Sequence, residues 1–244
     1  MNFEKIQLLR NAIDKAENIC VFTGAGISCP SGIPDFRSAN GLYNSGDFKG
    51  FSPEEIVSHN FFVNKTSMFY DFYKKNMMFP ESKPNKAHMF FAGLQKKGKK
   101  VTVVTQNIDG LHSAAGSKEV YELHGSIHRN YCTQCGEFYD CDYVYRSDGV
   151  PVCEKCGATV KPDVVLYGEG LDDETVYGAI NAVRQASLLI VIGTSLAVYP
   201  AASFLGYFRG ETTAVINKTA TPYDSKADIV INDDVAVVAE YLGV

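Results

Sequence analysis

The chain has 244 residues, of which 45% are hydrophobic and 21% charged, an ordinary balance for a soluble globular protein. This length allows one substantial core, or one large and one small lobe. The formal net charge of −5 argues against nucleic acid as the main partner. Since no apolar run approaches the roughly 20 residues that cross a bilayer, we expect no membrane partner.

Seven cysteines bear on the compartment and on metal binding: Cys20, Cys29, Cys132, Cys135, Cys141, Cys153 and Cys156. Their odd number and two Cys-x-x-Cys pairs indicate a reducing compartment with metal ligation instead of disulfides. The first residues hold no basic segment followed by an apolar one, so we expect no signal peptide and a cytoplasmic protein.

The chain is predicted to open with a helix, a strand and a glycine turn. Apolar residues at helical spacing predict an amphipathic helix within residues 3–17, and residues 19–23 predict a buried strand. Gly24-Ala25-Gly26 follows directly. Glycines there let backbone N–H groups approach a phosphate, and the N-terminus of a following helix would favour its charge. Because ordinary turns also use such glycines, this pattern alone is weak evidence of a nucleotide.

The residues after the glycines are more specific. Cys29 stands where the dehydrogenase fingerprint Gly-x-Gly-x-x-Gly has its third glycine. The chain continues into Asp35-Phe36-Arg37, which places an acid, an aromatic ring and a guanidinium side by side. A simple helix cap does not require that trio. The segment therefore predicts a nucleotide site unlike that of the hydride-transfer enzymes.

Residues 40–95 are rich in phenylalanine and tyrosine and are predicted to be helical, with Pro80 and Pro84 interrupting the pattern. The spacing of the aromatic residues favours helices packed into a small lobe over a surface for stacking nucleic acid bases. We therefore predict a helical part of a smaller lobe here.

The rest of the chain predicts a parallel, doubly wound α/β sheet. Short apolar runs alternate with helical segments, which is typical of such sheets. The runs predict strands at 101–104, 188–192, 213–216 and 229–231, before a closing helix at 235–242. Small or polar residues end the predicted strands at 19–23, 101–104, 188–192 and 213–216. The carboxyl ends of parallel strands are where these sheets bind ligands.

Cys132-x-x-Cys135 and Cys153-x-x-Cys156, separated by seventeen residues, predict a zinc site. Two knuckles of this spacing bring four thiolates into a tetrahedron around Zn²⁺. Such a sphere is closed, so the zinc is expected to be structural and to stabilise a small module at about 127–161. Cys141 lies outside the knuckles, and catalysis has to be sought elsewhere.

Among five histidines, His124 is the leading candidate for a general base, because Glu122-Leu123-His124-Gly125 leads into the zinc module at a predicted lobe junction. A histidine near its free pKa of about 6.5 can accept a proton at neutral pH. His112 is the main rival. Gln106, Asn107 and Asp109 follow a predicted strand, where amide and carboxylate groups can orient a hydroxyl, a water or a carboxamide; an Asx turn is the alternative.

Taken together, these motifs resemble the sirtuins, a family of NAD-dependent protein lysine deacylases. The resemblance covers about residues 10 to 242, in the family's order. It rests on Gly24-Ala25-Gly26-Ile27-Ser28, Ile33-Pro34-Asp35-Phe36-Arg37, Thr105-Gln106-Asn107-Ile108-Asp109, Leu123-His124-Gly125, both Cys-x-x-Cys pairs and Gly193-Thr194-Ser195-Leu196.

The resemblance implies one catalytic domain over residues 1–244, built from two lobes with NAD and acyl-lysine meeting in the cleft. The large Rossmann-like lobe is expected at about 1–39, 95–126 and 162–244. The small lobe is expected at about 40–94, which is helical, and 127–161, the zinc module. NAD is then a consumed co-substrate, and the zinc is structural.

The resemblance also implies site residues. The cofactor set is Gly24, Ala25, Gly26, Asp35, Phe36, Arg37, Gln106, Asn107, Ile108, Asp109, His124, Gly193, Thr194, Ser195, Asn217, Lys218 and Ala236. In it, Phe36 shields the reacting ribose carbon from water, Asn107 and Asp109 line the nicotinamide pocket, and His124 is the base. Asn107 is counted as catalytic too. The implied peptide-binding residues are Val164, Val165, Leu166, Tyr167, Gly168 and Val198.

The expected reaction is deacetylation of protein lysines, giving nicotinamide, O-acetyl-ADP-ribose and free lysine. Relatives that prefer succinyl or malonyl groups carry a Tyr-x-x-Arg pair in the helical segment, whereas this chain has Tyr70-Asp71-Phe72-Tyr73. Because burying a second carboxylate without a cation is costly, acetyl groups are expected over succinyl groups.

Two other functions stay open at this point. The same NAD site fits a mono-ADP-ribosyltransferase, and the chain could also be a catalytically silent NAD-sensing or zinc-scaffold module. The joint presence of Asn107, Asp109 and His124 argues against a silent module, which would not need all three. The expected partners are acetyl-lysine proteins or peptides, without direct nucleic acid binding, and a monomer is expected.

Overall fold

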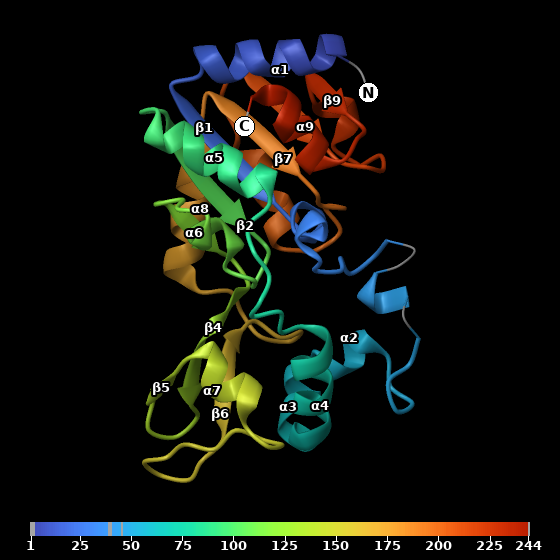
Figure 1. The fold of residues 1–244 in the computed structure, drawn as a ribbon, viewed down its shortest axis with the longest axis vertical. Coiled ribbons are helices and arrows are strands. Elements are labelled where there is room, and N and C mark those ends of the chain that lie inside the picture. The colour runs from blue at the N-terminus through green and yellow to red at the C-terminus, as the bar shows by residue number, and fades with distance from the viewer. Residues whose placement is uncertain (1–2, 39–40, 45, 244) are drawn as a thin grey trace.

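The computed structural model describes residues 3–38, 41–44 and 46–243. A large lobe and a small lobe lie one above the other in Figure 1. The large lobe contains a six-stranded parallel sheet in the order β3-β2-β1-β7-β8-β9. Its strands are β1 (Asn18–Thr23), β2 (Lys100–Thr105), β3 (Val120–Glu122), β7 (Leu188–Ile192), β8 (Thr212–Ile216) and β9 (Ile229–Ile231).

The strand order reverses direction beside β1, and this reversal positions the site. From β1 the chain builds outward through β2 to β3, and then returns to the other side of β1 with β7, β8 and β9. Thr23 at the end of β1 is in register with Thr105 of β2 and Ile192 of β7. A doubly wound sheet leaves a crevice at the carboxyl ends of its strands at such a point.

Helices cover both faces of the sheet, which explains why its central strands β1 and β7 are almost continuously apolar instead of alternating. Ile19 and Val21 of β1 pack into a core formed with α1 (Phe3–Lys15), α5 (Lys86–Lys96) and α9 (Val235–Leu242). Cys20 and Phe22 point to the opposite face, where α8 (Asp173–Gln185) and the 3₁₀ helix η4 (Ala201–Tyr207) pack.

The small lobe combines short helices with an antiparallel sheet in the order β5-β4-β6. Its elements are α2 (Pro53–Ile56), α3 (His59–Asn64), α4 (Thr66–Asn76), β4 (Gly125–Cys132), β5 (Phe138–Tyr139), α7 (Cys141–Arg146) and β6 (Val160–Val164). Aromatic residues fill its core: the rings of Phe69 and Tyr73 stack at 5.4 Å, and Phe62 meets Phe69 edge to face. The prediction of aromatic helices in a small lobe is confirmed for α3 and α4.

Short elements complete the fold. The helix α6 (Leu111–Ala114) follows β2. The remaining 3₁₀ turns are η1 (Ala25–Ile27), η2 (Cys29–Ser31), η3 (Leu42–Asn44) and η5 (Asp224–Lys226). None of the helices in the described part of the chain is long and apolar enough to cross a membrane.

The predicted fold class, a doubly wound parallel sheet with a smaller lobe, is confirmed, with two corrections. Helix α5, assigned to the small lobe by the boundary at residue 94, packs on the large sheet through Ala87, Phe91 and Leu94, because its apolar face meets β2 and α9. Strand β3 was not predicted, since its three residues, Val-Tyr-Glu, are only half-buried and too few to form a pattern. The predicted domain of residues 1–244 includes positions 1, 2, 39, 40, 45 and 244, which lie outside the described residues.

Candidate active site

A cavity of about 560 Å³ opens where the carboxyl ends of β1, β2, β7 and β8 meet the small lobe. Twenty predicted residues line it: Gly24, Ala25, Gly26, Asp35, Phe36, Arg37, Gln106, Asn107, Ile108, His124, Val164, Val165, Leu166, Tyr167, Gly168, Gly193, Thr194, Ser195, Val198 and Asn217. The structure therefore gathers at one place residues that the sequence spreads over most of its length.

Three predicted residues, Asp109, Lys218 and Ala236, are not among the described residues that line the cavity. The ammonium group of Lys218 pairs with Asp234 at 2.8 Å, and the backbone N–H of Ala236 donates to the same carboxylate. Lys218 and Ala236 therefore both contact Asp234, the residue that caps the N-terminus of α9. Asp109 is joined through Ser28 to Asn107, which does line the cavity.

The glycine turn at the end of β1 is packed against the loop after β7. The N–H of Gly26 donates to the carbonyl of Gly193 at 2.8 Å, and a Cβ atom on Gly26 would lie 2.7 Å from the Gly193 Cα. Only glycine fits at this approach. The turn continues into the 3₁₀ helices η1 and η2, so the predicted α-helix N-terminus is wrong at this point.

His124 reaches the cavity from the junction between β3 and β4. Its Nδ1 lies 2.9 Å from the carbonyl oxygen of Gln106, which can only accept, so Nδ1 carries the proton and Nε2 is left unprotonated. Burial lowers the pKa of His124, and the hydrogen bond to Gln106 only partly offsets this effect. An uncharged imidazole with a bare nitrogen at a cavity is suited to act as a general base.

His112, the rival candidate, has no access to the cavity. It is 2% exposed, and its Nε2 lies 3.1 Å from the hydroxyl of Thr23. Burial holds its pKa well below the usual value. Its ring packs edge to face against His88, with centroids 4.8 Å apart. The geometry therefore separates the two histidines by position alone.

A buried serine links Asn107 to Asp109. The Asn107 amide donates to the Ser28 hydroxyl at 3.1 Å, and that hydroxyl donates to the Asp109 carboxylate at 2.6 Å. Burial raises the pKa of Asp109, while hydrogen bonds from Ser28 and from the N–H of Leu111 act in the opposite direction. Ser28 was not among the predicted site residues, although it belongs to the glycine motif that carried the resemblance.

The segment after the glycine turn lines the cavity with Asp35, Phe36, Arg37 and Ser38. The Asp35 carboxylate accepts the backbone N–H groups of Arg37 and Ser38 at 3.1 and 2.8 Å, which forms an Asx turn. This turn presents Phe36 to the cavity, and the Phe36 ring packs against Tyr43 at 5.3 Å. An aromatic side chain at this position can exclude water.

Two tyrosines join this segment to the predicted peptide-binding segment. The hydroxyl groups of Tyr43 and Tyr167 lie 2.9 Å apart, and the Arg37 guanidinium lies 5.2 Å from the Tyr43 ring centroid. Tyr167 is also bridged to the small lobe, since its N–H donates to Val57 and its carbonyl accepts from His59.

Nine further residues line the cavity that the sequence did not indicate as site residues: Ser38, Tyr43, Val57, Met77, Glu169, Leu171, Tyr199, Pro200 and Thr219. Glu169 and Tyr199 end the two segments whose resemblance implied the peptide-binding residues, so that signal could have found them. The other seven belong to no motif that the resemblance used. Tyr70 and Tyr73, on which the expected acyl preference rested, are instead fully buried in the small-lobe core. The Tyr70 hydroxyl donates to the carbonyl of Val160.

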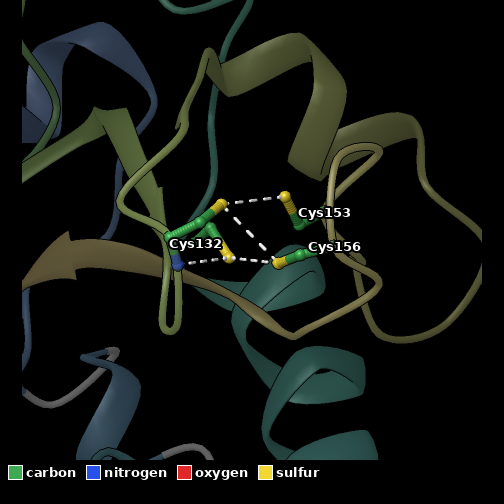
Figure 2. A group of neighbouring side chains, drawn as sticks. Cys132, Cys153 and Cys156 are labelled. Carbon is green, nitrogen blue, oxygen red and sulfur yellow. Dashed lines mark hydrogen bonds between the residues drawn. The ribbon is translucent and has the colours of Figure 1, made fainter.

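The four predicted cysteines form a compact cluster at the far end of the small lobe. Figure 2 shows Cys132, Cys153 and Cys156 directed toward one another, from the end of β4 and from the loop before β6. The sulfur atoms of Cys132 and Cys156 are 3.4 Å apart, those of Cys135 and Cys153 are 3.5 Å apart, and all four lie within 4.8 Å of one another. A Zn²⁺ ion with four thiolates at about 2.3 Å requires sulfur separations of about 3.8 Å. The cluster fits a structural zinc ion.

Comparisons with known proteins agree with this site. The model of the Sir2 family matches residues 24–200. An NAD-dependent protein deacetylase of Clostridium perfringens is 54% identical over 96% of this chain and 97% of its own length. One of Clostridium acetobutylicum is 51% identical over 97% of each.

Solved structures show the same likeness. A complex of Sir2 with a p53 peptide and NAD⁺ superposes with a TM-score of 0.85 at 36% identity, covering 98% of this chain and 96% of that one. A complex of a Sir2 variant with a deacetylated p53 peptide and 3′-O-acetyl ADP ribose has a TM-score of 0.88 at 37% identity, covering 97% of this chain and 96% of that one. This chain belongs to the Sir2 family.

Proposed function

We propose that this protein is an NAD-dependent protein lysine deacetylase, which releases nicotinamide, O-acetyl-ADP-ribose and free lysine. The observation that carries the proposal is the state of His124. This residue lines the cavity, its imidazole is uncharged, and its Nε2 carries no proton. Similar proteins bear the name of this activity, and related structures hold NAD⁺ with a p53 peptide or an acetylated peptide.

The cavity residues fit NAD. At one end the close approach of Gly24 and Gly26 to the loop at Gly193 leaves backbone free of side chains, which suits a pyrophosphate. At the other end Asn107, backed by Ser28 and Asp109, presents amide groups of the kind that a carboxamide pairs with. When bound, NAD supplies a ribose carbon from which nicotinamide can leave.

Each protein group then has a chemical task. The Nε2 of His124 accepts a proton from a ribose hydroxyl, and burial keeps the ring neutral for this purpose. Phe36 keeps water from the reacting carbon, because water there would hydrolyse the nucleotide instead of transferring the acyl group. Asn107 holds the nicotinamide end. Residues Val164 to Gly168, with Val198, hold the acyl-lysine peptide as an added strand.

The zinc ion has no part in these steps, since four thiolates close its coordination sphere. It stabilises the small lobe, which supplies Val57 and Met77 to the cavity. Together with Tyr43, these residues make the small-lobe side of the cavity largely apolar. This supports acetyl groups over succinyl groups, although Arg37 is a cation on the same cavity.

We further propose a cytoplasmic monomer whose partners are acetylated proteins and not nucleic acids. Four of the seven cysteines gather into a cluster suited to a metal instead of pairing as disulfides, which supports a reducing compartment. The net charge of −5 disfavours a polyanionic partner.

The test is to incubate the protein with an acetyl-lysine peptide, with and without NAD, and to follow the products by mass spectrometry. We expect one nicotinamide and one O-acetyl-ADP-ribose for each lysine released, and no turnover with His124→Ala, which should keep its zinc. Deacetylation that needs no NAD would overturn the proposal. Transfer of labelled ADP-ribose to protein by His124→Ala would favour a mono-ADP-ribosyltransferase, and equal turnover of succinyl peptides would overturn the acyl preference.

A further inference from the structure

Two buried histidines lie behind the cavity wall, where the proposed chemistry does not use them. His88, on α5, is 0% exposed, and His112, on α6, is 2% exposed. Their rings meet edge to face with centroids 4.8 Å apart. Each ring has one nitrogen with a hydrogen-bond partner and one nitrogen without a partner among the described residues.

The partners determine the tautomer of each ring. The Nδ1 of His88 lies 3.3 Å from the backbone N–H of Asn85, so Nδ1 accepts and the ring proton resides on Nε2. For His112, the Thr23 hydroxyl donates its proton to Thr105 at 2.8 Å. The oxygen of Thr23 is then an acceptor, so the Nε2 of His112 donates to it and Nδ1 is left bare.

This assignment makes the two unpartnered nitrogens complementary. The Nε2 of His88 is a buried donor, and the Nδ1 of His112 is a buried acceptor. A buried donor without a partner is rare in native proteins. The rings are in contact, and neither of these nitrogens has a partner among the described residues, so donor and acceptor stay matched as long as both rings are neutral. Burial supports neutrality, because it lowers the pKa of His88 to about 4 and that of His112 well below its usual value.

From His112, a hydrogen-bonded circuit leads to the cavity wall. Thr105 accepts the backbone N–H of Asn107 at 3.0 Å as well as the hydroxyl of Thr23. Asn107 reaches Asp109 through Ser28, and the Asp109 carboxylate accepts the N–H of Leu111, the neighbour of His112, at 2.9 Å. The circuit therefore closes on the helix that carries His112.

We propose that His88 and His112 form a positioning pair that orients Asn107 and Asp109 at the nicotinamide end of the site. The pair sets the direction of the hydroxyl hydrogen bonds between Thr23 and Thr105, and this direction holds the backbone of Asn107 in place. The role of the pair in orienting the nicotinamide end rests on the proposed deacetylase activity. The tautomers of the two rings do not depend on that activity.

The first test needs no turnover. In long-range ¹H–¹⁵N correlation spectra of uniformly labelled protein at neutral pH, we expect His88 and His112 to be neutral and both protonated at Nε2. The spectra of His88→Gln and His112→Gln identify the two signals by their loss. A charged ring at either position, or a proton on Nδ1 of His112, would overturn the assignment even if the enzyme is active.

The second test separates positioning from stability. His112→Leu removes the donor to Thr23, whereas His112→Gln keeps an N–H at the end of the side chain. For His112→Leu we expect KM for NAD and the inhibition constant of nicotinamide to rise about tenfold, the scale of one lost hydrogen bond. KM for the peptide should change less than about twofold, because the peptide-binding segment is not part of the circuit. His112→Gln should recover most of the loss.

Thr23→Val and Val183→Ala complete the design. Thr23→Val breaks the same circuit at its next member, so its effect should repeat that of His112→Leu, and the double variant should be no worse than either. Val183→Ala makes a cavity in the core on the opposite face of the sheet and serves as the control of reduced stability. If Val183→Ala alters nicotinamide inhibition as much as His112→Leu does, or if His112→Leu lowers only the melting temperature, the positioning role is wrong. If the wild-type protein consumes no NAD, the proposed function fails, and the spectra still decide the tautomers.

Discussion

The two lobes are stabilised in different ways. In the large lobe, residues of a six-stranded sheet are buried on both faces, against α1, α5 and α9 on one side and α8 and η4 on the other. The small lobe has a three-stranded sheet, an aromatic core and a four-cysteine cluster in which Cys135 and Cys156 are exposed. The comparison indicates that apolar burial alone can order the large lobe, whereas the zinc module needs its metal.

The lobes also contribute differently to the site. The large lobe holds Asn107 and the glycine turn through buried backbone and side-chain hydrogen bonds. The segments near the junction, which carry Tyr43 and Tyr167, are joined by half-exposed or exposed side chains. We infer that reacting groups are placed by buried contacts within the large lobe and that substrate groups are placed by contacts between the lobes.

Removal of zinc should have the largest effect and should separate the lobes. For Cys153→Ser we expect loss of bound zinc and a fall in activity of at least about a hundredfold, because structural zinc contributes folding free energy directly. The strand and helix signals of the large lobe should remain in circular dichroism. Cys141→Ser is the matched control, since Cys141 is buried in the same lobe but lies outside the cluster. A Cys153→Ser protein that stays active without zinc would contradict the comparison.

Arg129 tests the contact between the lobes. From β4, its guanidinium pairs with Glu122 of β3 at 2.5 Å and with Asp163 of β6 at 2.7 Å. Because Glu122 leads to His124 and Asp163 leads to Val164, this pair of bonds aligns the base with the peptide segment. For Arg129→Gln we expect kcat/KM for the peptide to fall about tenfold, as for a charge-assisted contact.

The matched control is Lys155→Gln, which breaks an exposed ion pair with Glu137 inside the zinc module. Exposed pairs contribute about 0–1 kcal/mol, so Lys155→Gln should leave kinetics unchanged. Equal effects of the two variants would show that Arg129 acts through general stability and not through alignment.

The tyrosine contact should have a smaller effect. Tyr43→Phe removes the hydroxyl that lies 2.9 Å from Tyr167 and keeps the ring that packs against Phe36. We expect deacetylation to slow by about two- to fivefold, the scale of an exposed neutral hydrogen bond. Hydrolysis of NAD without peptide should increase, because the segment covers the cavity less well. Tyr145→Phe, on the zinc module, should change neither rate.

The pH profile should show the smallest effect, a displacement rather than a loss. Burial lowers the pKa of His124, so the neutral base persists to lower pH than in a free histidine. The acid limb of kcat/KM should therefore have its midpoint below about 6.5, the free value. A midpoint above this value would indicate that another group or a charged partner controls the base.

Much of this protein could be predicted from its sequence because the signals are local. Glycines after a strand, cysteine pairs two residues apart and apolar runs each reflect chemistry within a few residues, and they indicated the sheet and the metal cluster. Most of the cavity residues were implied by the family resemblance, which rests on short motifs in a fixed order. The predictions failed where the signal was short or depended on a distant partner. Strand β3 has three residues, and the assignment of α5 depends on which lobe its apolar face meets.

The sequence by itself determined the kinds of residue at the site and their order along the chain. The sequence favoured His124 over His112 as the base, and the tertiary structure shows the reason, which is access to the cavity. His112 and His124 are both polar residues near strand ends, but one is directed into the wall and the other lines the cavity. The same holds for Ser28, whose place between Asn107 and Asp109 arises from the pairing of β1 with β2. Whether a side chain reaches the cavity, and which hydrogen-bond partners it meets, depends on packing. Packing brings together residues that lie far apart in the sequence.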